Sequence, residues 1–201
     1  MRDLSSESVV LLIRERVNFL GYGLSPNWLG YCDRNQPFSI ELATKIIDEY
    51  NKYFSLENLI VVSALARLDG AVVDDDPNVS AHLVKVSDQL VGNGLVKPVT
   101  DSEAFFDDFD DFMGNPKFIS KRELSKELFS QISLACFVDS SIEGHCFFYD
   151  FVNNLISYPH DDTGYGFIGP SNNGIDSVLT EFSKSVNSIG GFSFHFKRSS
   201  C

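Results

Sequence analysis

Apolar and polar positions in the first part of the chain alternate mostly with helical spacing. In residues 5–20, apolar side chains recur every three or four positions, as they do on one face of an amphipathic helix. The same spacing predicts a helix over 40–54, capped by Ser39, and another over 79–92. Residues 55–70 are apolar on nearly every side, so we predict that they form the most buried helix.

The pattern changes in the last third of the chain. A further helix is predicted over 120–132, where Ser120 and Glu123 have the spacing of a capping box, and residues 133–140 are predicted to be a strand. Apolar alternation then predicts a three-strand meander and a last strand over 192–197. Between them, apolar residues on one helical face predict a helix over 175–186. The predicted class is α+β: an N-terminal helical half, followed by a mostly antiparallel β-sheet with a covering helix.

The meander is centred on residues 145–169, the densest aromatic stretch of the chain. Asn153-Asn154 lies between two β-prone runs and suits a two-residue turn, in which Val152 pairs with Leu155. Because side chains alternate along a strand, this register places a continuous aromatic and aliphatic stripe on one face and Asp150 on the other.

The length of 201 residues fits a single domain over 1–201. Asn115-Pro116 is the best candidate for a sub-boundary, with a helical part over 1–114 and the β-rich part over 117–201. We find no transmembrane run and no signal peptide, and the cysteines are widely spaced, so we expect reduced thiols and a cytoplasmic location. These cysteines are Cys32, Cys136, Cys146 and Cys201.

Charge narrows the range of partners. Sixteen basic and twenty-eight acidic side chains give a formal net charge of −12. Such a balance argues against nucleic acid and anionic membranes and electrostatically favours a basic protein partner, although many proteins are acidic for solubility alone. The oligomeric state is left open.

Acidic side chains gather in two places, and the larger cluster lies in residues 100–115. There, a short helix would bury phenylalanines and present carboxylates on the other side, either as a solvated surface or as a docking surface for a basic partner. The only tryptophan is predicted to lie in a loop, as a packed anchor or a binding hot spot. The candidate partner-binding residues are Glu103, Asp107, Asp108, Asp110, Asp111, Asp74, Asp75, Asp76 and Trp28.

One group of residues has the types needed for catalysis or metal binding: His145, Asp150, His160 and Asp161, with Asp162 beside them. In the predicted register Asp150 points away from His160, and residues 161–164 are good turn formers. We therefore expect turn and hydrogen-bonding roles, no catalytic residue and no cofactor. No common nucleotide-binding, hydrolase or metalloprotease motif occurs in the sequence, which also favours a protein that is not an enzyme.

The stretch FFYDFVNNLISYPHDDTGYGFI resembles the strand–turn–strand segment of small bacterial toxin immunity proteins, where a pattern of the type F-D-x-x-x-x-x-I-x-Y-x-x-D-D-x-G precedes a helix and a final strand. The segment 160–164 departs from the Tyr-Asp-Asp-Arg-Gly form of this turn. The resemblance implies a cytosolic immunity protein of a contact-dependent or other polymorphic toxin system, which binds and occludes a cognate toxin. A metal-assisted hydrolase and a regulatory adaptor are the alternatives.

Overall fold

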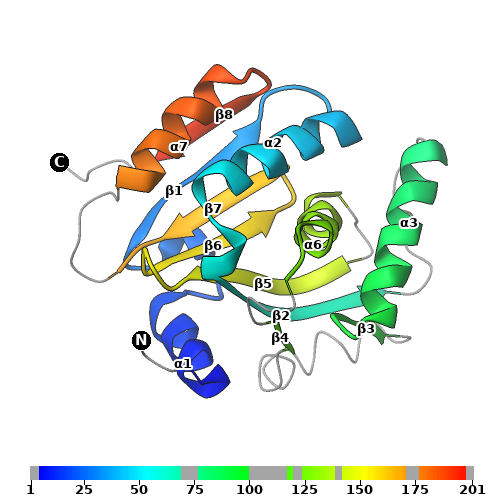
Figure 1. Ribbon diagram of the computed structural model, residues 1–201, viewed down its shortest axis with the longest axis horizontal. Helices are drawn as coiled ribbons and strands as arrows, with labels where there is room; N and C mark the ends of the chain where they lie inside the picture. The colour runs from blue at the N-terminus through cyan, green and yellow to red at the C-terminus, as the bar shows by residue number, and fades with distance from the viewer. Residues whose placement is uncertain are drawn as a thin grey trace.

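The computed structural model describes residues 5–68, 77–99, 117–119, 124–138, 142–170 and 177–197. Its strands form one mixed sheet in the order β3-β2-β5-β6-β7-β1-β8, with β4 also paired to β2 (Figure 1). The strands are β1 (Trp28–Arg34), β2 (Leu59–Leu68), β3 (Val96–Val99), β4 (Lys117–Ile119), β5 (Ile142–Asp150), β6 (Leu155–His160), β7 (Gly164–Ile168) and β8 (Phe192–Phe196). The helices are α1 (Ser6–Arg16), α2 (Ile40–Tyr53), α3 (Pro77–Gly92), α6 (Lys126–Val138) and α7 (Ser177–Ser188), with short 3-10 turns η1 (Tyr22–Leu24) and η2 (Leu56–Asn58).

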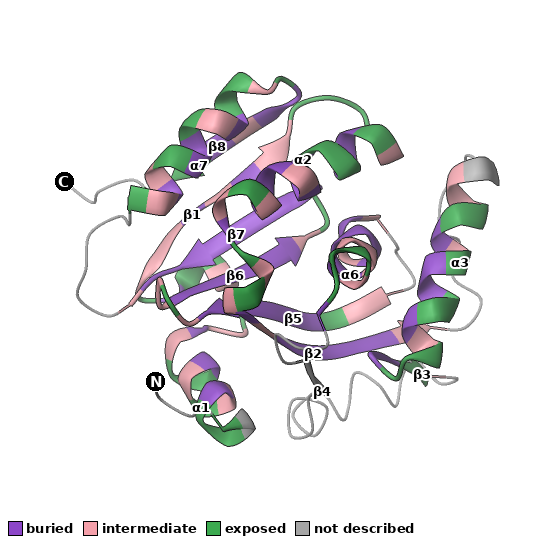
Figure 2. Ribbon diagram, in the orientation of Figure 1, coloured by how far each residue is buried: buried purple, intermediate pink, exposed green. Residues whose placement is uncertain are grey.

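The sheet separates two hydrophobic cores. Helices α2, α3, α6 and α7 pack on one face, and α1 packs on the other (Figure 1). The larger core includes Tyr50, Phe129, Tyr165 and Phe182, whereas the smaller core is formed by α1 side chains and the opposite faces of β2, β5, β6 and β7. Strands β5, β6 and β7 are buried along most of their length, and β1 is largely intermediate (Figure 2).

The structure confirms the amphipathic helices that were predicted from the periodicity of the sequence. The Ser5 side chain caps α1 by accepting a hydrogen bond from the Ser8 amide, and Ser39 caps α2 through the Leu42 amide at 3.1 Å. The helices α3 and α7 also lie where they were predicted. In α7 the buried stripe includes Leu179 and Phe182, which pack on the sheet as expected.

The predicted buried helix over 55–70 is wrong: residues 59–68 form β2, a central strand. Successive side chains of β2 point to opposite faces, so Val61 and Leu65 join the larger core and Val62 joins the core under α1. A strand buried on both faces has apolar residues at consecutive positions. Periodicity alone cannot distinguish such a run from a buried helix, which explains the error.

Two further assignments are corrected. Residues 133–138, predicted as a strand, are the C-terminal half of α6, a helix with buried residues on several sides between the sheet and α3. Residues 28–34, predicted as a loop around Trp28, are β1, which pairs with β7 on one side and β8 on the other. A register irregularity between Trp28 and Gly30 interrupts the alternation that would have identified β1 from the sequence.

The three-strand meander is confirmed, but the register of its first turn is shifted by two residues. Asp150 pairs with Leu155, so four residues connect β5 and β6 where a two-residue turn was predicted. The Asp150 carboxylate causes this longer turn, because Oδ1 accepts hydrogen bonds from the amides of Val152 and Asn153. A shift of two preserves the predicted faces: Phe148 faces the larger core and Tyr149 the smaller one.

The α+β class is confirmed, although the order of helices and strands matches the prediction only roughly. The N-terminal half, predicted to be helical, contributes β1, β2 and β3 to the sheet. All the described strand pairs are antiparallel except β2–β3, which α3 connects as a parallel crossover. Strands from both sides of the candidate sub-boundary at 115–120 thus lie in one sheet.

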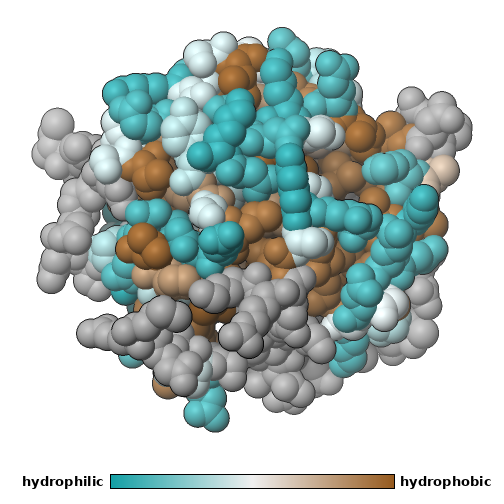
Figure 3. All heavy atoms as spheres, viewed as in Figure 1, coloured by the Kyte–Doolittle hydropathy of each residue, from teal (hydrophilic) through white to brown (hydrophobic). Residues whose placement is uncertain are grey.

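On the side seen in Figure 3, hydrophilic residues lie over α2 and α3, with hydrophobic residues between them. No helix within the described ranges is long and apolar enough to cross a membrane.

Candidate binding face

A row of aromatic and histidine side chains crosses four neighbouring strands on the α1 side of the sheet. In this row His195 of β8 pairs with Tyr31 of β1, Tyr31 pairs with Gly166 of β7, and Gly166 pairs with Tyr158 of β6. Directly paired residues point to the same face of a sheet, so His195, Tyr31 and Tyr158 form one row across the strands. Gly166 leaves the position between Tyr31 and Tyr158 without a side chain.

Glycine at two positions of β7 allows the side chains of β6 to reach across to β1. A Cβ atom at Gly166 would overlap the ring of Tyr158, which therefore lies directly over this residue. The Tyr158 hydroxyl accepts a hydrogen bond from Trp28 Nε1 at 3.0 Å. Glycine in a strand often marks such a close approach.

His160 makes the equivalent crossing two residue pairs further along the strands, at the next pair on the same face. Its partner on β7 is Gly164, and His160 Nε2 donates a hydrogen bond to the carbonyl oxygen of Cys32 on β1 at 2.9 Å. Burial lowers the pKa of His160 below its usual value, an effect opposed by the Cys32 carbonyl and by the carboxylates of Asp162, Asp161 and Asp33. The hydrogen bond to the Cys32 carbonyl oxygen holds the imidazole of His160 between β6 and β1.

The rings of β1 and β8 stack on one another at the surface. Trp28 and Tyr31 lie with ring centroids 5.9 Å apart and Tyr31 and His195 with centroids 5.0 Å apart, each pair at an interplanar angle of 28°. Trp28 and Tyr31 are half-buried and His195 is exposed, so part of each of these side chains is accessible to solvent. We call this set the aromatic–histidine face, formed by Trp28, Tyr31, Tyr158, His160 and His195.

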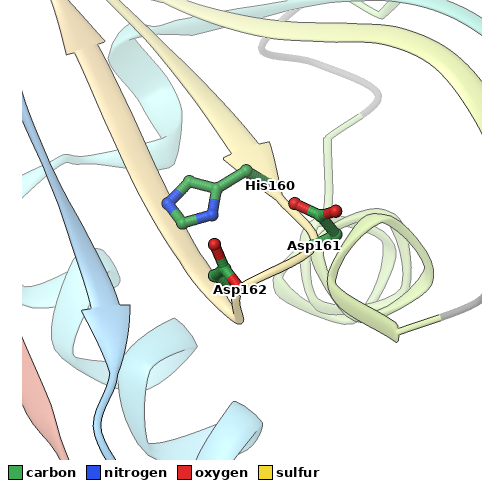
Figure 4. Close-up of side chains that lie close together, drawn as sticks. All are labelled: His160, Asp161 and Asp162. Atoms are coloured by element: carbon green, nitrogen blue, oxygen red, sulfur yellow. The ribbon is translucent and has the colours of Figure 1, made fainter.

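Carboxylates flank one end of the aromatic–histidine face. Asp33 Oδ1 lies 3.0 Å from Nε2 of His195, and its side chain retains 26% of its exposure. Asp161 and Asp162 follow His160 in the turn between β6 and β7 and are exposed. Figure 4 shows the His160 ring with the Asp162 carboxylate close to it. The Arg34 amide donates to the Asp162 carbonyl at 3.1 Å, which ties the turn to β1.

The four residues weighed as a catalytic or metal-binding group are not brought together. Asp150 accepts three hydrogen bonds within the β5–β6 connection, and it lies on the opposite side of β5 from His145. Among the described residues, the potential metal ligands that cluster are His160, Asp161 and Asp162, which are consecutive in one turn. The Thr163 amide closes this turn on the His160 carbonyl at 3.1 Å, as turn chemistry predicts.

His145 lies instead beneath the loop that follows α1. Its Nδ1 accepts a hydrogen bond from the Tyr22 hydroxyl, and Phe19 packs edge-on against its ring with centroids 5.2 Å apart. Burial lowers the pKa of His145 to about 4, so the imidazole is neutral at physiological pH. Burial also raises the pKa of Tyr22, which keeps its hydroxyl protonated as the donor.

We expect His145 to make folding sensitive to acid. The imidazole has a pKa of about 4 in the folded state and an ordinary value of 6.5. The unfolded chain therefore binds a proton that the folded chain does not, and stability falls as pH decreases from about 6.5 towards 4. The loss approaches about 3 kcal/mol when the whole interval is crossed.

Urea unfolding at about pH 7 and about pH 4.5 measures this loss. The His145→Gln variant should lose less stability between the two pH values than the wild type does. His82→Gln, at an exposed position on α3, is the matched control and should show the wild-type pH dependence. An equal pH dependence in wild type and His145→Gln would exclude His145 as the acid-sensitive group.

Only one of the candidate partner-binding residues predicted from the sequence lies in the described structure. Trp28 is anchored by its hydrogen bond to Tyr158 and remains partly exposed, so its role as a binding hot spot stays a prediction. The two acidic clusters, 74–76 and 103–111, lie outside the described residues. Tyr31 and His195 were missed, since their positions 164 residues apart become neighbours only through the pairing of β1 with β8.

Comparison of the chain with protein-family models, with curated proteins and with solved structures gives no match.

Proposed function

We propose that this protein is a cytosolic immunity protein that binds and occludes a cognate toxin through the aromatic–histidine face. The observation that supports the proposal is the face itself. Tyr31 and Trp28 stack at the surface, anchored by Tyr158, where a rigid aromatic pair offers a large contact area. Tyrosine and tryptophan are enriched among the residues that dominate binding energy at protein interfaces.

The charge of the molecule favours a basic toxin, such as a nuclease with a positive substrate-binding surface. The chain carries a net charge of −12, and the carboxylates of Asp33, Asp161 and Asp162 flank the aromatic–histidine face. A negative surface attracts a positive partner during diffusional encounter, and close aromatic contacts then slow dissociation. The resemblance of residues 147–169 to immunity proteins supports the choice of this class of binding proteins.

The test is coexpression with the product of each neighbouring gene. A toxin encoded beside this chain should stop growth when expressed alone, and coexpression of this chain should restore growth. In the purified complex, Tyr31→Ala should weaken binding by at least about 2 kcal/mol, which is the range of an interface hot spot. Calorimetric titration measures the change, and Tyr53→Ala, on α2 at the opposite face, serves as the control.

A second variant separates this face from the acidic segment. Replacing Asp107, Asp108, Asp110 and Asp111 with asparagine removes the carboxylates that the sequence also offers as a docking surface. If the toxin binds Tyr31→Ala as it binds the wild type and fails only with the asparagine variant, the interface lies at residues 107–111. If no neighbouring product is bound or neutralised, the immunity function itself is wrong and a regulatory adaptor becomes the better interpretation.

A further inference from the structure

We propose that the aromatic–histidine face is an arginine-recognition site, which takes the guanidinium group of a side chain on the basic partner and discriminates against lysine. The inference deepens the proposed function, on which it rests for the identity of the partner. It concerns the chemical class of ligand at this face, and free peptides can test it without the toxin.

The rings on this face are nearly parallel to one another. Trp28, Tyr31 and His195 form a ladder in which successive planes are inclined by only 28°. A planar group can stack on such a surface without reorganising it. Guanidinium is planar, delocalised and less strongly hydrated than ammonium, so it stacks on aromatic faces more readily than a lysine side chain does.

Carboxylates lie at one end of the ladder. Asp33 lies two residues after Tyr31 on the same side of β1, and its carboxylate reaches His195. Asp162 lies beside β1 at the same end, because its carbonyl binds the Arg34 amide. A cation stacked at the His195 end of the ladder would therefore be close to carboxylates, which can accept hydrogen bonds from guanidinium in a planar fork.

The opposite end of the ladder carries a positive charge. Lys197 follows β8, and its Nζ donates to the carbonyl oxygen of Pro26, two residues before Trp28, at 3.2 Å. The face thus has a basic end near Pro26 and an acidic end near Asp33. This asymmetry orients the ligand. A guanidinium gains most at the end formed by His195 and Asp33, and a carboxylate on the same partner segment would be accommodated near Lys197.

The test uses the full chain and three short peptides that are identical except at two positions. Both positions carry arginine in the first peptide, lysine in the second and citrulline in the third. Citrulline keeps the planar shape without the charge, and lysine keeps the charge without the planar shape. Trp28 is the only tryptophan of the protein, so its fluorescence reports directly on this face. We expect a saturable change in Trp28 emission with the arginine peptide. The arginine peptide should bind at least about threefold more tightly than the lysine peptide, and more tightly than the citrulline peptide as well.

Two variants assign the binding to the proposed residues. Asp33→Asn should reduce the affinity for the arginine peptide and leave that for citrulline unchanged, whereas Asp88→Asn, at an exposed site on α3, should change neither. Tyr31→Leu should reduce the preference for arginine over lysine. The comparison of the three peptides on the wild-type protein decides the matter even if a variant does not fold.

Equal affinity for the arginine and lysine peptides, or an unchanged Trp28 emission, would overturn arginine recognition. These results would leave the immunity function intact if the toxin still depends on Tyr31. Conversely, selective binding of the arginine peptide, together with no neighbouring gene product bound, would retain the site and remove the proposed toxin partner.

Discussion

The Tyr50→Ala variant is expected to lose about 3–5 kcal/mol of unfolding free energy, the range for removing a large aromatic from a core. Tyr50 is fully buried, and its ring lies at the centre of the larger core. Its centroid is 4.4 Å from that of Tyr165, 4.5 Å from Phe54 and 5.2 Å from Phe129. Alanine would leave a cavity bounded by α2, α6 and the sheet, which these elements cannot fill without moving together.

The hydroxyl of Tyr50 contributes separately from its ring. It forms a hydrogen bond of 2.6 Å with Ser157 Oγ on β6, so it links α2 to the middle of the sheet. Tyr50→Phe keeps the ring and should cost about 0.5–1.5 kcal/mol, since one buried hydrogen bond is lost while Ser157 Oγ keeps its bond of 3.4 Å to the Phe148 carbonyl oxygen. Urea denaturation of both variants measures the two contributions. Tyr53→Ala, half-buried on the same helix, is the control, and a loss in Tyr50→Ala no larger than in Tyr53→Ala would contradict the central position of Tyr50.

The sequence predicted the elements whose two sides differ in polarity. Helix α2 has a buried stripe, a polar outer side and a capping Ser39, and each of these is a local signal. The faces of β5 and β6 followed from the alternation of their residues, even though the turn at Asp150 shifted the register. A shift of two residues preserves the faces, because the side-chain period of a strand is two.

The sequence failed where burial is the same on both sides of an element. Strand β2 and the second half of helix α6, residues 132–138, are both mostly apolar and largely enclosed by other elements. Their identity depends on what surrounds them: β2 pairs with β5 from Leu59 to Arg67 and on its other edge with β3 and β4. Such tertiary pairing is not encoded in local periodicity.

The aromatic–histidine face could be predicted only in part, although one signal for it was present. Glycine alternates with an aromatic residue in β7, at Gly164 and Gly166, and glycine in a strand indicates that another group approaches closely. This pattern predicts that something crosses β7. It does not name Tyr158 and His160 as the crossing groups, nor Tyr31 as their neighbour, because those depend on the pairing of β6 and β1 with β7.

Replacing Gly164 with alanine tests this crossing directly and should be among the most destabilising single substitutions in the chain. A Cβ at Gly164 would overlap the carbonyl oxygen of Cys32 and would lie 3.3 Å from His160 Nε2. The obstacle is backbone, so β1 and β7 must separate, and overpacking of this kind costs at least about 3 kcal/mol. Separation would also weaken the hydrogen bond of 3.3 Å from the Tyr165 amide to the Cys32 sulfur.

Two other glycines provide the comparison in urea unfolding. Gly166→Ala meets only the far end of the Tyr158 ring, so it should cost less, about 1–3 kcal/mol, and should change Trp28 emission by displacing the Tyr158 hydroxyl. Gly92→Ala, at the end of α3, meets no atom within 4 Å and should be neutral or slightly stabilising. Wild-type stability in Gly164→Ala would show that β1 does not approach β7 this closely. The path by which His160 reaches β1 would then have to be different.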